Sequence, residues 1–173
     1  VVAVSNAKFS EIRWFYPSSD STENNRYVVY NFQDQTWSIG ELARSAAIDA
    51  GVYRYPIYAD PDTKKIYEHE VGHSYGNLTP FAESGPISIG LGDNVMNVTN
   101  LIPDERTQGD VTVTFKTRFY PNDTERSYGP YNMANPTSVR FTGRQVRVRI
   151  EGANLTDWRA GINRLEVKQG GKR

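Results

Sequence analysis

The clearest potential for chemistry lies in two histidines that flank a glutamate, in the stretch His69-Glu70-Val71-Gly72-His73. On an α-helix, residues four apart share one face, so both imidazoles can bind one zinc ion. The glutamate can then activate a zinc-bound water, as in a metallopeptidase. Gly76 also matches the glycine of the longer metzincin pattern. A zinc peptidase with His69 and His73 as ligands and Glu70 as base is therefore one hypothesis.

The elements around this pattern do not favour the helix that such a site needs. Residues 63–70 follow the turn Asp60-Pro61-Asp62 and lack an apolar stripe of helical period, which predicts the returning strand of a hairpin. On a strand, His69 and His73 would lie roughly 13 Å apart at about 3.3 Å per residue, too far to share a metal. The competing expectation is a hairpin end in which His69 forms a hydrogen bond with a neighbour.

The rest of the sequence offers few further zinc ligands. The metzincin pattern would place its third ligand at Thr79, and the chain contains only two histidines. A third ligand would have to be a carboxylate such as Glu83 or Glu105, and neither lies on a recognisable helix. The chain has no cysteine, which excludes disulfides, thiolate zinc sites and cysteine nucleophiles. We therefore expect no metal, no cofactor and no enzymatic activity.

The charge of the chain is balanced overall but uneven along its length. Lys plus Arg and Asp plus Glu each number 20, so net charge draws the chain neither to nucleic acid nor to a membrane surface. The sequence contains no run of 18 apolar residues, so it predicts no membrane-spanning helix. Residues 140–173 nevertheless contain nine basic against three acidic side chains. A solvated strand face explains this excess, and the alternative is an interaction face formed by Arg144, Arg147 and Arg149 toward DNA or acidic neighbours.

Alternating apolar residues in the last third of the chain predict antiparallel strands. Val111, Val113 and Phe115 alternate with polar residues, and so do Val146 and Val148. Short strand candidates, frequent glycine and proline, and little helical pattern predict an all-β fold. Residues 76–173 are expected to form an antiparallel β-sandwich.

The first part of the chain predicts meander and hairpin strands like those of a propeller blade, over residues 1–75. Strands are expected over residues 11–16, 26–32 and 36–40, of which the second is apolar on both faces, as in a strand covered on both sides. Residues 41–50 are predicted as a short helix or an irregular connection. Residues 51–60 and 63–70 are predicted to pair as a hairpin, with Pro56 favouring an edge position.

Aromatic residues are plentiful and suggest a third kind of function. Trp14, Trp37 and Trp158 lie on predicted strands, where their large apolar area favours burial in a core. The alternative is a carbohydrate-binding β-sandwich that presents exposed Trp or Tyr side chains to a glycan.

Several stretches spread over most of the chain carry a resemblance to a known family: Trp14-Phe15-Tyr16-Pro17, Asn25-Arg26-Tyr27-Val28-Val29-Tyr30-Asn31, Phe81-Ala82-Glu83-Ser84-Gly85-Pro86, Leu101-Ile102-Pro103-Asp104-Glu105, Phe115-Lys116-Thr117-Arg118-Phe119-Tyr120-Pro121, Gly143-Arg144-Gln145-Val146-Arg147 and Asp157-Trp158-Arg159-Ala160-Gly161-Ile162-Asn163-Arg164-Leu165. They resemble the C-terminal region of tailed-bacteriophage tail and neck structural proteins of the nozzle, hub or DNA-stabilisation type.

This resemblance implies a virion component of the phage tail or neck, assembled in the host cytoplasm. Larger members of the family contain β-propellers and form rings around the DNA channel, so the expected partners are copies of the chain, other tail or neck proteins and packaged DNA, with no membrane. A carbohydrate-binding module would in this setting belong to a tail tip. The resemblance also implies that the second histidine of the pattern, His73, is dispensable. At 173 residues the chain holds too few strands for a whole propeller, as expected of part of a longer protein.

Overall fold

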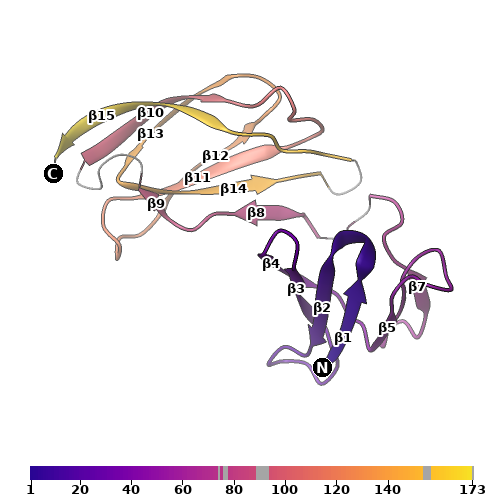
Figure 1. Cartoon of the computed structure of the whole chain (residues 1–173). Helices are drawn as coiled ribbons and strands as arrows, with labels where there is room; N and C mark the ends of the chain where they lie inside the picture. The colour runs from indigo at the N-terminus through magenta and orange to yellow at the C-terminus, as the bar shows by residue number, and fades with distance from the viewer. Residues whose placement is uncertain (74, 76–77, 89–93, 154–156, 173) are drawn as a thin grey trace. The chain divides into compact units, whose positions relative to one another are not determined.

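The computed structural model describes residues 1–73, 75, 78–88, 94–153 and 157–172, and the chain is all-β in them (Figure 1). Their one helical element is a 3₁₀ turn, η1 (Ala7–Phe9), and every pairing between strands is antiparallel. The all-β, antiparallel prediction is thus confirmed. The chain divides into two compact units, Val1–Gly72 and His73–Arg173, where the sequence predicted a boundary after residue 75. Each unit is described by itself below.

The first unit contains a four-stranded meander whose strands follow one another in sequence order, β1 (Val2–Asn6), β2 (Glu11–Tyr16), β3 (Arg26–Asn31) and β4 (Thr36–Glu41). Period-two alternation directs Phe15 and Val29 to one face, where both are buried. Val28 and Tyr30 point to the opposite face and pair with Ile39 and Trp37 of β4. Strand β3 is therefore apolar on both sides, as its sequence indicates.

A second sheet of the first unit is built from three short strands in the order β5 (Ala46–Ile48), β6 (Ile57–Ala59) and β7 (Ile66–Glu68). Tyr58 of this sheet is fully buried and meets Phe15 edge to face, with ring centroids 5.7 Å apart. Val4 belongs to the same buried cluster, and Tyr27, Leu42 and Ala47 pack against it. The two sheets of this unit thus share one small aromatic core.

Three predictions for residues 41–60 are wrong or incomplete. The helix considered for residues 41–50 does not form, because β4 continues to Glu41 and β5 occupies Ala46–Ile48. Only Ile57–Ala59 of residues 51–60 is a strand, while Val52 lies in a bend and is 98% exposed. Strand β6 lies between β5 and β7, so Pro56 does not mark an edge strand. Pro56 precedes β6, where its missing N–H costs no ladder hydrogen bond, and its carbonyl accepts one from the His69 N–H.

The second unit is a β-sandwich of two sheets. One sheet follows the order β12 (Arg126–Asn132), β11 (Thr112–Arg118), β14 (Gln145–Glu151) and β8 (Phe81–Glu83), and the short β9 (Ile87–Ser88) also pairs with β14. The other sheet follows the order β13 (Thr137–Gly143), β10 (Asn94–Ile102) and β15 (Arg164–Lys172). Residues from both sheets form a single core cluster, including Val113, Phe115, Val146, Leu101 and Phe141. The predicted alternation of β11 and β14 is therefore the alternation that fills this core.

Trp158 closes the core between β14 and β15 by lying directly over a glycine. A Cβ built on Gly152 would come within 2.0 Å of the Trp158 ring, so only glycine leaves room for the indole at this point. Trp158 is half-buried and packs against the core cluster, in agreement with the core position predicted for it.

Candidate functional site

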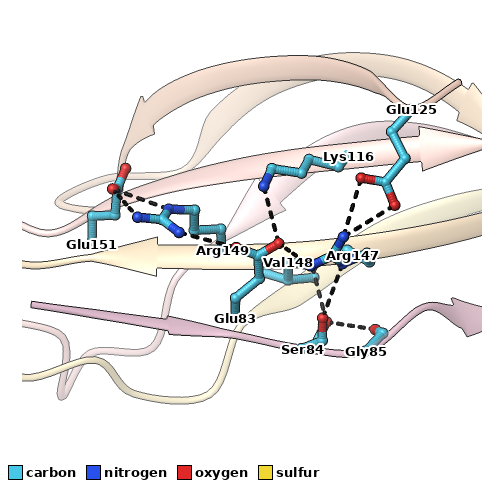
Figure 2. A network of polar contacts seen from close by, with 9 residues as sticks. All are labelled: Glu83, Ser84, Gly85, Lys116, Glu125, Arg147, Val148, Arg149 and Glu151. Atoms are coloured by element: carbon cyan, nitrogen blue, oxygen red, sulfur yellow. Dashed lines mark hydrogen bonds and ion pairs between the residues drawn. The ribbon is translucent and has the colours of Figure 1, made fainter. Parts of the chain in front are cut away.

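The charged side chains of the second unit meet on the outer face of the sheet that contains β14. Because side chains alternate along a strand, Arg147 and Arg149 point away from the core that Val146 and Val148 enter. The register pairs Arg147 with Lys116 of β11 and Arg149 with Glu83 of β8. Strands β11 and β14 thus bring three cations to one carboxylate of β8, which lies between them (Figure 2).

The carboxylate of Glu83 accepts a charge-assisted hydrogen bond at each oxygen. Lys116 Nζ lies 3.0 Å from Oε1 and Arg149 Nη1 lies 3.0 Å from Oε2, while Arg147 forms an ion pair with Oε1. The Glu83 side chain is only 12% exposed. The hydrogen bonds from Lys116 and Arg149 and the nearby positive charges lower the pKa of Glu83, although burial opposes this shift. Glu83 is therefore an ionised hydrogen-bond acceptor and a poor general base.

Two further carboxylates complete this cluster, which we call the Glu83 network, at its two ends (Figure 2). Glu125 accepts from Arg147 Nη1 at 3.2 and 3.3 Å, and Glu151 accepts from Nε and Nη2 of Arg149 at 3.0 and 2.9 Å. Three carboxylates therefore balance three cations. The arrangement acts as a clamp, because it ties the three-residue edge strand β8 to β14 and β11.

The side chain of Ser84 extends this clamp beyond the end of β8. Its hydroxyl accepts a hydrogen bond from the Val148 N–H at 3.0 Å and donates one to the Gly85 carbonyl at 2.9 Å (Figure 2). The Ser84 N–H donates to the Val148 carbonyl at 2.9 Å. The Ser84 hydroxyl is thus engaged with two backbone groups, and the residue serves to hold the chain against β14.

Of the three arginines predicted to form an interaction face, the structure brings only two together. Arg147 and Arg149 share the outer face of β14, whereas Arg144 lies in the turn between β13 and β14. The guanidinium of Arg144 lies 5.3 Å from the centre of the Tyr120 ring, and its backbone N–H donates to the Arg118 carbonyl. None of the ion pairs among the described residues includes Arg144. Its positive charge is therefore the least compensated of the three.

His69, the first residue of the zinc-peptidase pattern, lies immediately after β7 in the first unit. Its Nε2 accepts a hydrogen bond from Arg44 Nε at 3.0 Å, and its ring stacks on Tyr58 with centroids 4.1 Å apart. Burial, reinforced by the positive charges of Arg44 and Arg13, lowers the pKa of His69 to about 4. The imidazole is thus neutral at pH 7 and has its Nε2 lone pair in use.

Glu70 is held by residues of the first meander and does not face a metal-binding histidine pair. Its Oε1 accepts a hydrogen bond from Asn6 Nδ2 at 3.0 Å and lies 3.6 Å from a guanidinium nitrogen of Arg13. Glu70 has a left-handed backbone, with φ 62°, so residues 69–73 do not form the helix that would align both histidines. No group of three His, Cys, Asp or Glu side chains suited to a metal occurs within the described residues. His69 and Glu70 therefore do not fit the roles of zinc ligand and base.

An aromatic surface lies on the outer face of the first meander, at a position that sequence reasoning assigned to the core. Trp37 is 64% exposed, so its predicted burial is wrong, and Ile39 beside it on β4 is 76% exposed. Trp14 stacks on Trp37 with ring centroids 6.1 Å apart, and Tyr30 approaches Trp37 at 4.6 Å. These four residues, Trp14, Tyr30, Trp37 and Ile39, are called the aromatic face below.

No family model matches the sequence of the chain, and no curated protein matches it. Within the described residues, no helix has the length and apolar character needed to cross a membrane. The candidate sites are therefore described by their geometry alone. They are the charge-balanced Glu83 network in the second unit, and the polar hairpin end and the aromatic face in the first unit.

Proposed function

We propose that this chain is a non-enzymatic structural component of a bacteriophage tail or neck, which assembles with copies of itself into a ring around the DNA channel. The observation that carries the proposal is the aromatic face of the first unit. Trp37 and Ile39 leave large apolar surfaces in water, and contiguous apolar surface on a folded domain marks a place where another protein binds. The resemblance of several stretches to phage tail and neck proteins supplies the context of the assembly.

The composition of this surface suits an interface better than catalysis. Tryptophan and tyrosine contribute much of the binding energy of protein interfaces because they bury a large area with few rotatable bonds. Trp37 already stacks on Trp14 and Tyr30, so it is held in place before a partner arrives. The partner in this proposal is a neighbouring copy of the chain in the ring, together with other tail or neck proteins.

The Glu83 network supports the mechanical side of the proposal. Its charge-assisted hydrogen bonds connect β8, β11, β12 and β14 on the face opposite the core, because Glu125 directly precedes β12. A sheet fastened on both faces resists shear between its strands, as expected of a component that withstands passage of DNA. The proposed location is accordingly the virion.

In this proposal the second unit lines the channel, and Arg144 is the residue that contacts packaged DNA. Arg147 and Arg149 are neutralised by carboxylates, whereas Arg144 has no acidic partner among the described residues. The substitution R144E should lower affinity for duplex DNA and flatten its salt dependence, measured by fluorescence anisotropy. The matched control is K65E, which reverses an exposed lysine of the first unit. Equal binding by R144E and wild type would remove the DNA contact from the proposal.

The ring itself is tested by electron microscopy of the purified full chain and two variants. Wild type should form closed rings, and W37S should lose them because it removes the most exposed aromatic ring of the aromatic face. The matched control is V52S, which removes an apolar side chain that is 98% exposed but lies in a bend outside that face. Rings that survive in W37S would show that the aromatic face is not the interface.

The exposed Trp37 also favours a second candidate function, a carbohydrate-binding module of a phage tail tip. A planar indole supported by Trp14 and Tyr30 can stack on the apolar face of a sugar ring. A glycan array distinguishes the two candidates, because binding of specific glycans that disappears in W37S would favour recognition of a cell surface. An array without binding, together with rings that W37S abolishes, would favour the structural role.

A further inference from the structure

Strand β15 is a long free edge of the sandwich. It is the last strand in the order β13-β10-β15, and β10 is its one partner strand within the part of the chain that the structure describes (Figure 1). It runs for nine residues, Arg164–Lys172, and contains no proline. Its pairing with β10 shows a bulge in β15 only between Gln169 and Lys172, so Arg164–Gln169 is a regular open edge, and an open edge pairs readily with another strand. We therefore expect another strand to pair with this edge.

The side chains of β15 define what that partner must look like. Leu165 and Val167 are half-buried against the core, and the residues between them, Arg164, Glu166 and Lys168, are exposed. A strand that adds to this edge should place an apolar residue opposite Val167 on the inner face. On the outer face it must not place a like charge opposite any of these three, since like charges directly opposite each other are destabilising.

We infer that the partner is β15 of a second copy of this chain, paired antiparallel about a two-fold axis at Val167. In this register Glu166 of each copy lies opposite Lys168 of the other, so two complementary charge pairs form. Val167 meets Val167 of the second copy on the inner face. Residues that pair are both odd-numbered or both even-numbered, so the backbone groups that point away from β10 meet equivalent groups of the other copy.

The neighbouring registers have either like charges opposite each other or a shorter overlap, so the register centred on Val167 is favoured. An axis at Glu166 places Glu166 opposite itself, and an axis at Lys168 places Lys168 opposite itself. An axis at Leu165 does pair Arg164 with Glu166, but only Arg164–Glu166 of the strand then overlaps. The axis at Val167 pairs Leu165–Gln169, which precedes the bulge, with its own reverse and combines a longer overlap with complementary charge.

A groove beside β15 gives the second copy further apolar and polar contacts. It has a volume of about 510 Å³ and is lined mainly by apolar side chains of β8, β9, β14 and β15, among them Ile87, Val148 and Leu165. Asn163 also lines it, and the Oδ1 of Asn163 is buried without a hydrogen-bond partner in the described structure. Gln169 of the second copy lies opposite Leu165 on the same face, next to Asn163, and its amide can donate to this oxygen.

This contact is separate from ring formation in the proposed function. A two-fold contact is isologous and closes after two copies, whereas a ring needs a heterologous contact between different surfaces. The aromatic face and the β15 edge also belong to different units of the chain. Each contact can therefore be removed without removing the other.

Disulfide trapping tests the register directly, because the chain has no cysteine of its own. Directly opposite residues of antiparallel strands have Cα atoms about 4.5–5.5 Å apart, which permits a disulfide, and a shift of two residues exceeds the limit of about 7 Å. Equal amounts of E166C and K168C should give a covalent dimer on oxidation, whereas each variant alone should stay uncrosslinked. A mixture that gives no dimer, or single variants that crosslink as well as the mixture, would overturn the inference.

Charge reversal gives an independent readout by sedimentation of the full chain. E166K and K168E should each weaken the two-fold pairing about tenfold, because each places like charges opposite each other twice. The double variant E166K/K168E restores opposite signs and should recover the wild-type affinity. Pairing that is equal in wild type and both single variants, or a double variant as weak as the singles, would contradict the register. Rings in micrographs should persist in all three variants, so loss of the β15 pair is distinguishable from failure of the proposed function.

Discussion

Arg44 donates a hydrogen bond from Nε to Nε2 of His69 at 3.0 Å, and this contact decides what the imidazole can do. A guanidinium has no lone pair to give and remains charged, so His69 must be the acceptor and must be neutral. The burial of the ring on Tyr58 works in the same direction. The histidine that begins the zinc-peptidase pattern is therefore a structural element of the hairpin end.

The first prediction concerns the stability of the chain as a function of pH. The pKa of His69 is lowered to about 4 in the folded state, from an unfolded value near 6.5. Between these values the unfolded chain binds more protons, so stability rises with pH and is lost as the pH falls from about 6.5 to 4. Thermal unfolding should show this decline in wild type, and H69Q, which keeps an acceptor but does not titrate, should show less of it. Identical pH profiles for both proteins would contradict the neutral, buried imidazole.

The second prediction concerns zinc. The purified chain should contain no stoichiometric zinc by elemental analysis, and added zinc should not raise its melting temperature. H73A should behave like wild type in both measurements, because His73 is exposed and belongs to the second unit. Stoichiometric zinc that is lost in H73A would instead support the peptidase hypothesis, with its metal held by a rearranged segment.

The third prediction concerns the Glu83 network. E83Q should destabilise the chain by about 2 kcal/mol, because it weakens charge-assisted hydrogen bonds at both carboxylate oxygens and leaves Lys116, Arg147 and Arg149 under-compensated. The matched control is E125Q, which affects Arg147 alone and should cost less. Urea unfolding measures both. Equal losses for the two variants would show that Glu83 is not the centre of the clamp.

The same carboxylate contributes to acid stability with a defined sign. Its pKa is lowered in the folded state, so its contribution is fully present above the unfolded pKa and disappears as the pH falls through the folded value. The stability difference between wild type and E83Q should therefore be largest near neutral pH and shrink in acid. A difference that stays constant into acid would mean that E83Q acts through packing alone.

The fourth prediction concerns the glycine beneath Trp158. G152A adds a methyl group where the Trp158 ring lies, so the indole must move and the sandwich should lose about 1–3 kcal/mol. Tryptophan fluorescence should shift to the red as the ring becomes more hydrated. G85A is the matched control, since no atom lies within 4 Å of a Cβ at Gly85. An unchanged spectrum and an unchanged stability in G152A would contradict the packing of Trp158 on Gly152.

The sequence predicted the sandwich where alternation was strong and missed it where alternation was short. Val113 and Phe115 lie on a regular strand, and their burial follows from period two. Strand β13 is as long as β11 and β14, but Val139 and Phe141 are its only alternating apolar residues, so its signal is weaker. Strand β12 contains Gly129-Pro130, and this pair is typical of a turn, so the sequence of β12 does not indicate a strand.

The candidate sites were harder to predict, because they depend on contacts between distant parts of the chain. Glu83 and Arg149 lie on β8 and β14, and no local pattern reveals that these strands pair. The exposure of Trp37 could not be predicted either, because the sequence pattern of a strand is the same whether its apolar face is covered by another element or exposed to solvent. Arg144 is a different case, because it is three residues from Arg147 and period-two alternation along one strand would already place the two side chains on opposite faces; the structure puts Arg144 in the turn before β14.

The central claim is that the chain acts by assembling with copies of itself, and the mass of the purified chain under native conditions tests it most directly. Native mass spectrometry of wild type should show one dominant species at a fixed multiple of the 19.6 kDa chain, and W37S should shift that population to smaller particles while V52S leaves it in place. A wild-type chain that remains 19.6 kDa at every concentration, with W37S and V52S indistinguishable from it, would contradict the account.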